Sequence, residues 1–269
     1  MYRADLHCHS TCSDGTCSPK ELLLLAKEKE LSALSITDHD TIAAYTDSLI
    51  EESKKIGVRL LLGVEFSTRH KNFPVHILGY GYQKTEDLLA FCDMHQERRW
   101  NRNRAILEKL RRLSIIVEES ELGDPNDRTI GRPHIAEILV KKRYVTSIQE
   151  AFDRYIGEKK PCFDPGVNFT PEETIEVIHK AGGKAFIAHP HLIKKGKIER
   201  ELLDMDFDGI ECYYGLFHSG QEKRWLKIAE EKGLLISGGS DFHGEIKPHI
   251  PLGCSWVDEE KVKAIFGET

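Results

Sequence analysis

The sequence predicts an α/β fold built on a parallel sheet, and three observations support this prediction. Short β-rich runs alternate with amphipathic helical stretches in both the first and the final third of the chain. Two of these helices carry clear N-terminal capping signals. The length of 269 residues suits one α/β barrel with an insertion, and it allows a sizeable apolar core.

The first third contains the clearest sequence signal for a helix start. Ser18 is placed as the N-cap, Pro19 follows at the first helical position, and Glu21 stands three residues after the cap, which is a capping box. We expect strands on both sides of this helix. Their predicted ranges are 2–6, 33–36, 59–64 and 75–79.

The final third repeats the same pattern. Thr170, Pro171 and Glu173 open a second capped helix. Strands are expected after it at 184–188, 209–212 and 234–237. Strands that alternate with helices favour a parallel sheet, because a parallel crossover needs a helix-sized connection.

Residues 85–165 interrupt this alternation. They begin with one long basic helix at about 86–113, continue through a polar loop with Gly123, Asp124 and Pro125, and end in shorter helical patterns. We interpret them as a mainly helical insertion that forms a substrate cap. The barrel domain is then made of residues 1–84 and 166–269.

Composition limits the classes of protein that the chain can belong to. No apolar run approaches the roughly 18 residues of a membrane helix, and the N-terminus has no signal-peptide pattern. Seven cysteines without CxxC spacing predict reduced thiols. We therefore expect a soluble cytoplasmic protein without a membrane partner, and the 8% aromatic content gives no support for extended sequence-specific recognition of RNA or DNA.

Histidine and acidic residues gather where the predicted strands end. His7 and His9 stand two apart, so strand alternation puts both rings on one face and turns Cys8 away. Further candidates follow along the chain: Asp14, His39, Glu65, His76, His189, Asp241 and His243. One such pair alone is more often a surface or core feature, but so many together predict a multinuclear site for divalent cations, with manganese first and zinc or iron as alternatives.

The long basic helix supplies candidates for substrate binding. Projected at 100° per residue, Arg98, Arg102 and Lys109 lie opposite the apolar arc and are expected to face solvent, whereas Arg99 and Asn103 fall within it. A guanidinium there is costly unless it faces a cleft or an anion. Arg99 and Asn103 are therefore predicted substrate contacts.

A second set of candidates lies at a later helix start and after a later strand. Arg132 and His134 open a helix, where backbone N–H groups and the Arg fork can bind a phosphate. The alternative for His134 is a helix cap or a core position. Glu211 and Tyr213 follow another strand and are candidates for the pocket wall, although packing explains Tyr213 equally well.

The segments that carry these residues resemble the polymerase and histidinol phosphatase (PHP) superfamily. The resemblance extends over essentially the whole chain through DLHCHSTCSDG, ITDHD, GVEFS, HILGY, IAHP and GGSDFHG. It implies a distorted (β/α)7 barrel. The insertion with GRPH at 131–134 is similar to the subgroup of nucleoside 3′,5′-bisphosphate phosphatases and RNase AM-type exoribonucleases.

The resemblance also implies how two or three divalent cations would be held. One ion would be bound by His7, His9, Glu65 and Asp241, and a second by His76 and His189 with Glu65 bridging. A third would use Asp14, His39 and His243. The neighbouring Asp38 and Asp40 are expected to support these ligands and not to bind metal.

The implied activity is hydrolysis of a phosphate ester by hydroxide held between the ions, with His7, His9, Glu65 and Asp241 acting through it and His134 as a further catalytic candidate. We expect removal of the 3′-phosphate from a nucleoside 3′,5′-bisphosphate, with 5′-to-3′ trimming of short RNA as a related activity. An alternative is a phosphatase for histidinol phosphate or another small phosphomonoester. A non-enzymatic alternative is a metal-stabilised binding module.

Overall fold

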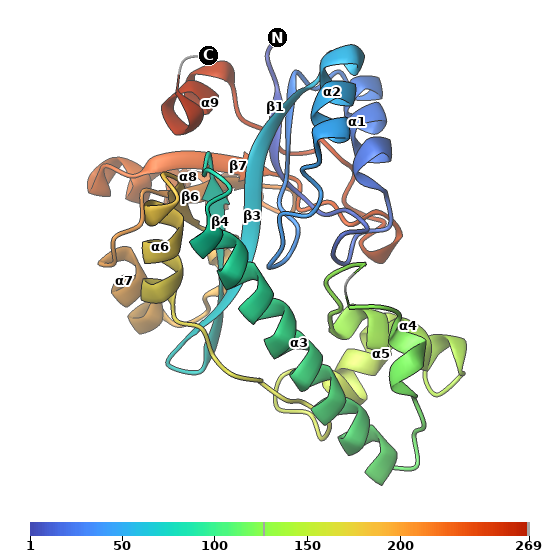
Figure 1. Ribbon diagram of the computed structural model, residues 1–269. Coiled ribbons are helices and arrows are strands. Elements are labelled where there is room, and N and C mark those ends of the chain that lie inside the picture. Colours follow the sequence, from blue (N-terminus) through green and yellow to red (C-terminus); the bar gives the residue numbers. More distant parts are fainter. Residues whose placement is uncertain (126, 268–269) are drawn as a thin grey trace. The chain divides into compact units, whose positions relative to one another are not determined.

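The computed structural model describes residues 1–125 and 127–267. The chain divides into two compact units, one made of Met1–Phe91 with Phe169–Thr269 and the other of Cys92–Asn168. We call them the sheet unit and the helical unit, and Figure 1 colours them along the sequence. Among the described residues, none of the helices combines the length and the apolar character that crossing a membrane requires.

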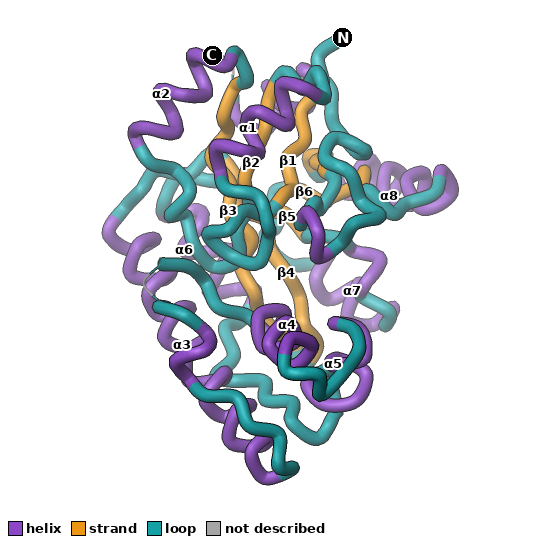
Figure 2. Tube along the Cα trace, turned by 90° about the vertical axis from the view of Figure 1, so that its right-hand side faces the viewer, coloured by secondary structure: helices purple, strands orange, loops and turns teal. Residues whose placement is uncertain are grey.

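The sheet unit is built on strands that pair in the same order as they follow in the sequence, and Figure 2 colours the strands orange. They are β1 (Ala4–Cys8), β2 (Ala33–Ile36), β3 (Arg59–His70), β4 (Phe73–Tyr80), β5 (Lys184–Ile187), β6 (Gly209–Tyr214) and β7 (Leu235–Gly239). The first and last strands meet as well: the Asp241 N–H donates to the His7 carbonyl at 2.7 Å, and the His9 N–H donates to the Phe242 carbonyl at 2.9 Å. The sheet is thus a nearly closed barrel, which confirms the predicted fold class.

The direction of β4 differs from the prediction of an all-parallel sheet. β4 pairs antiparallel with both β3 and β5, whereas the remaining neighbours are parallel. Only Lys71 and Asn72 connect β3 to β4, with φ values of 46° and 68°. Such a two-residue connection with two left-handed residues makes a hairpin, and it is too short for a parallel crossover.

This hairpin also changes where two candidate ligands lie. Glu65 and His76 lie inside β3 and β4 and do not follow strand ends, and His7 likewise lies inside β1, so the prediction that every ligand follows a strand is wrong for these three. Glu65 is opposite Leu78 in the antiparallel ladder. Since residues two apart share a face, Glu65 and His76 are diagonal neighbours on the same side of the sheet.

The sheet unit contains the helices α1 (Pro19–Glu28), α2 (Asp47–Ile56), α6 (Pro171–Lys180), α7 (Gly196–Leu203), α8 (Ser219–Lys232) and α9 (Glu259–Phe266). Two of them, α1 and α6, begin where the sequence signals predict. Both predicted capping boxes form. The Glu21 N–H donates to Ser18 Oγ at 3.3 Å while Glu21 Oε2 accepts from the Ser18 N–H at 2.7 Å, and Thr170 and Glu173 make the equivalent pair.

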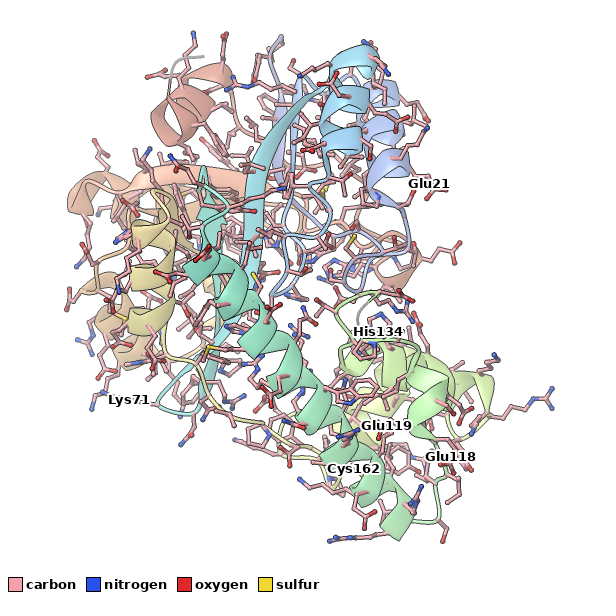
Figure 3. The ribbon with its side chains drawn as sticks, viewed as in Figure 1. Glu21, Lys71, Glu118, Glu119, His134 and Cys162 are labelled. Carbon is pink, nitrogen blue, oxygen red and sulfur yellow. The ribbon has the colours of Figure 1, made fainter. Side chains whose placement is uncertain are left out.

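The helical unit packs around its own apolar core. It contains most of α3 (Glu86–Arg112), then η1 (Glu119–Leu122), α4 (Arg132–Lys141), α5 (Ile148–Ala151) and a π-helical turn at Phe152–Ile156. Ile106, Leu110, Ile135 and Leu139 are fully buried there together with Cys162, which Figure 3 labels. The extent of α3, Glu86–Arg112, confirms the predicted long helix at 86–113.

Close contact between β7 and β1 depends on Gly239. A Cβ atom at this position would lie 2.4 Å from the His7 N atom and 2.5 Å from the His7 Cβ. We expect Gly239→Ala to lower the free energy of unfolding by about 1–3 kcal/mol, because the two strands must move apart to admit the methyl group. Thermal or urea unfolding measures this change.

Gly196, at the start of α7, is the matched control because its Cβ would meet nothing within 4 Å. Gly196→Ala should leave the unfolding midpoint unchanged or raise it slightly. Equal midpoints for the two variants would contradict the assigned role of Gly239.

Candidate metal centre

The structure brings all nine predicted ligands together in the sheet unit. Among the residues that the structure describes, three groups of side chains have donor atoms that all lie within 4.8 Å of one another. They are His7, His9, Glu65 and Asp241; His9, Asp14, His39 and His243; and His39, Glu65 and His76. His189 joins them, since its Nε2 lies 2.8 Å from Glu65 Oε1.

The first group has the spacing that a single metal ion requires. His7 Nε2 lies 3.3 Å from His9 Nε2, and these two nitrogens are 3.3 and 3.1 Å from Glu65 Oε2. Asp241 Oδ1 lies 3.5 and 3.4 Å from the same nitrogens. Ligands about 2.0–2.1 Å from a tetrahedral ion are about 3.3–3.4 Å from each other. The residues present therefore fit a divalent cation with nitrogen and oxygen ligands.

Glu65 connects this group to a second set of imidazoles. Its Oε2 faces His7 and His9, while its Oε1 lies 2.8 Å from both His76 Nδ1 and His189 Nε2. Burial alone would raise the pKa of this carboxyl, but His39, His76 and His7 hold it well below its usual range. One carboxylate oxygen towards each set is the arrangement that a bridging ligand needs.

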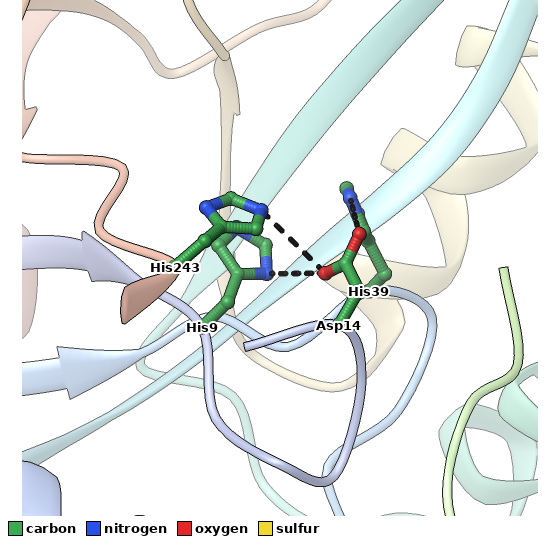
Figure 4. Close-up of side chains that lie close together, drawn as sticks. All are labelled: His9, Asp14, His39 and His243. Atoms are coloured by element: carbon green, nitrogen blue, oxygen red, sulfur yellow. Dashed lines mark ion pairs between the residues drawn. The ribbon is translucent and has the colours of Figure 1, made fainter. Parts of the chain in front are cut away.

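The group of His9, Asp14, His39 and His243 is arranged around Asp14, as Figure 4 shows. Asp14 Oδ1 lies 3.7 Å from His9 Nδ1 and 3.5 Å from His243 Nε2, while Oδ2 lies 3.8 Å from His39 Nε2. A neutral imidazole has only one nitrogen with a free lone pair. His9, which presents Nε2 to the first group and Nδ1 to Asp14, can be a neutral ligand in only one of them.

Neighbouring carboxylates position the loops that carry these ligands. Asp38 accepts hydrogen bonds from the Ser10 N–H and hydroxyl and from the Ser13 hydroxyl, in the segment that leads to Asp14. Asp40 accepts from the Ser67 N–H at 2.6 Å. Neither carboxylate belongs to a donor group among the described residues, and both hold backbone or hydroxyl groups of the segments around the cluster.

Two residues at Asp241 were missed from the sequence. Asp241 Oδ1 faces the imidazoles, and its Oδ2 accepts from the Tyr214 hydroxyl at 2.6 Å and from Lys247 Nζ at 2.7 Å. A register shift between Glu211 and Tyr213 in β6 changes the alternation of the strand. Tyr214 rather than Tyr213 therefore reaches the cluster. For Lys247, the sequence offered one signal of a contact with Asp241, its position six residues later.

Protons and metal ions compete for the first group. Burial would lower the pKa of His9, but hydrogen bonds to Asp241 and Glu65 raise it to about 9. The pKa of His7 also lies well above its usual value, because Glu211, Glu65 and Asp241 outweigh the effect of burial. Without metal, the neighbouring carboxylates therefore favour the protonated form of these rings.

Metal binding should therefore release protons. Each displaced proton makes the apparent affinity for a divalent cation rise about tenfold per pH unit, up to the pKa of about 9 at His9, above which the dependence should flatten. Isothermal titration in two buffers with different ionisation enthalpies counts the released protons. An affinity that is constant between pH 6 and pH 9 would contradict this description.

The predicted substrate contacts lie in the helical unit, near the start of α4. Asn103 is fully buried and donates from Nδ2 to the Ile130 carbonyl at 2.9 Å. Arg99 is 6% exposed, and its Nη1 lies 3.2 Å from the position of a Cβ atom at Gly131. His134, labelled in Figure 3, accepts from the Gly131 N–H through Nδ1 at 2.9 Å, which is the capping alternative.

The other basic residues of this unit have separate environments. The guanidinium of Arg132 lies over the rings of Phe152 and Phe163 and donates to the Ile156 carbonyl. Arg98 is 6% exposed, so the prediction that it faces solvent is wrong. Arg98 lies seven positions after the buried Phe91 and therefore on the same face of α3. This buried face is wider in the first half of the helix than the apolar arc of the second half indicates.

Comparison with known proteins identifies the family. The model of the PHP domain matches residues 5–159, which is more than half of the chain. The chain belongs to the PHP domain family. The predicted resemblance is thereby confirmed, and so is the expected class, a metal-dependent hydrolase of phosphate esters.

Similar proteins cover nearly the full length of this member of the PHP family. A 5′-3′ exoribonuclease of Haemophilus influenzae is 35% identical over 94% of this chain and 92% of its own length. A 3′,5′-nucleoside bisphosphate phosphatase of Chromobacterium violaceum is 31% identical over 90% of this chain and 88% of its own. A solved structure from Bifidobacterium adolescentis, described as a candidate metal-dependent phosphoesterase, has a TM-score of 0.88 at 30% identity and covers 97% of this chain and 94% of its own.

Proposed function

We propose that this protein removes the 3′-phosphate from nucleoside 3′,5′-bisphosphates and also trims short RNA from its 5′ end, using two or three divalent cations. The observation that carries the proposal is the spacing of the nine donor residues around Glu65. The bisphosphate phosphatase and the exoribonuclease among the similar proteins support the substrate class. We further propose that the protein works in the cytoplasm.

The proposed ligands are those expected from the family resemblance. His7, His9, Glu65 and Asp241 would hold one cation, and His76 and His189 would share Glu65 with a second. Asp14, His39 and His243 would hold a third. Manganese is the first expectation and zinc or iron the alternatives, since these ligands offer imidazole nitrogen and carboxylate oxygen without thiolate.

Divalent cations bound there would activate water and neutralise charge on the phosphoryl group. The chain itself contributes the positions of the ligands and a further positive charge. Lys247, whose Nζ lies 2.7 Å from Asp241 Oδ2, keeps a cation beside the carboxylates. Burial would lower the pKa of this amine, but the neighbouring Asp241 raises it, so it stays charged at neutral pH.

We propose residues 85–165 as the substrate-binding insertion, with Arg99, Asn103, Arg132 and His134 as its contacts. Arg99 is the strongest of these candidates. Its guanidinium is buried and lies beside Gly131, where α4 begins, so it can donate to a phosphate that binds at this helix N-terminus. His134 already caps this helix, so its catalytic role is the weakest part of the proposal.

A substrate panel tests the proposed activity. Purified protein loaded with manganese should release phosphate from a nucleoside 3′,5′-bisphosphate faster than from histidinol phosphate, and should shorten a 5′-phosphorylated RNA oligonucleotide. Preference for histidinol phosphate would support the small-phosphomonoester alternative. Bound metal without release of phosphate from any ester would support a binding module.

Loss of a ligand should nearly abolish turnover. His9→Ala and Asp241→Asn are each expected to lower kcat by more than about 100-fold, because a metal site worth several kcal/mol of transition-state stabilisation is lost. Metal content by elemental analysis should fall in parallel. Glu201→Gln is the control, since Glu201 also contacts a histidine, His70 at 2.9 Å, but lies outside the donor groups.

Arg99→Ala should weaken substrate binding more than turnover. We expect KM for the bisphosphate to rise about 10- to 100-fold, which corresponds to the loss of one charge-assisted contact. Arg104→Ala is the matched control, because Arg104 is exposed and pairs with Glu119 at 2.7 Å. Unchanged kinetics in the Arg99 variant would remove Arg99 from the substrate site.

A further inference from the structure

Glu211 in β6 is a fully buried carboxylate that contacts two of the proposed ligands. Its Oε1 lies 2.8 Å from His7 Nδ1, and its Oε2 accepts a hydrogen bond from the backbone N–H of His189 at 2.6 Å. His7 belongs to the group around Oε2 of Glu65, whereas His189 lies against Oε1. Glu211 therefore touches both halves of the centre and lies in none of the donor groups found among the described residues.

The contact with His7 determines which ring nitrogen can bind metal. When Nδ1–H donates to Glu211, the lone pair of a neutral His7 is at Nε2. This atom faces His9, Glu65 and Asp241 at 3.3–3.5 Å. A carboxylate behind a ligating imidazole holds the ring orientation and increases its basicity.

The contact with His189 holds an unusual backbone conformation. His189 has φ 27° and ψ 62°, in the left-handed region that a residue with a side chain rarely adopts. Pro190 follows directly, and a residue before proline favours extended backbone, so this conformation of His189 needs support from its surroundings. The short hydrogen bond to Glu211 fixes the His189 N–H, and this conformation places the ring Nε2 2.8 Å from Glu65 Oε1.

The position of β6 explains how one side chain reaches both residues. β6 lies between β5 and β7 in the sheet, His189 follows β5, and His7 lies in β1, which meets β7. The register shift after Glu211 occurs where the strand approaches the cluster. Bulges of this kind change the direction of side chains next to functional sites.

We propose that Glu211 is a positioning residue that couples the two metal positions on either side of Glu65. It sets the tautomer of His7 and the backbone of His189 at the same time, so its loss weakens both positions together. The inference rests on the proposed metal centre and adds a residue that acts on the metals only through their ligands.

Glu211→Gln tests this coupling with little change in size. An amide has one acceptor oxygen, so it can accept from His7 or from the His189 N–H but not from both with the same geometry. We expect the affinity for Mn²⁺ or Co²⁺ to fall about 10- to 100-fold at both positions. Titration calorimetry measures the affinities, and the visible absorption of bound Co²⁺ reports a changed ligand geometry.

Asp208 offers a matched control just before the start of the same strand. Its Oδ2 accepts from the Ala185 N–H and contacts His179 Nε2, both at 2.7 Å, so it also joins one imidazole to one backbone N–H. Asp208→Asn should lower the unfolding midpoint without changing Co²⁺ affinity or its spectrum. This comparison separates a role at the metals from a general effect on β6.

The possible results separate the inference from the proposed function. Wild-type affinity and spectrum in Glu211→Gln would overturn the coupling role alone. Absence of metal binding by the wild-type protein would overturn the proposed function as well. If Glu211→Gln does not fold, Glu211→Asp keeps the charge on a side chain one methylene shorter, and the same loss of affinity is expected.

Discussion

The structure depends on one buried carboxylate surrounded by imidazoles. Glu65 faces His7, His9, His39, His76 and His189 at 2.8–3.3 Å. A buried charge is costly unless positive charge accompanies it, so this cluster must hold protons or metal ions. The same residues that would bind metal thus determine the electrostatic balance of the barrel interior, and folding and metal binding are linked properties of this chain.

The antiparallel strand β4 is what completes the surroundings of Glu65. The β3–β4 hairpin continues past Glu65 and returns with His76 on the same face. The neighbouring strand β5 then leads directly to His189. A local reversal of strand direction therefore gives the second oxygen of Glu65 its two partners.

Most of the site could be predicted from the sequence because its information is local. Alternation in a strand places His7 and His9 on one face, and short family segments identify the other ligands. Long-range contacts carry no such signal. Tyr214 and Lys247 contact Asp241 only because of a register shift in β6 and the conformation of a loop. The burial of Arg98 was missed for a similar reason, since a helical projection shows periodicity but does not show what packs against each turn.

The seam between β1 and β7 has a consequence for protein synthesis. His7 and Ser240 lie 233 positions apart and still share a hydrogen bond, and Asp241 follows immediately. The first donor group therefore cannot form until nearly the whole chain has left the ribosome. A nascent or C-terminally truncated chain that ends before Asp241 carries His7, His9 and Glu65 without their fourth partner, so the first donor group is completed only late in synthesis.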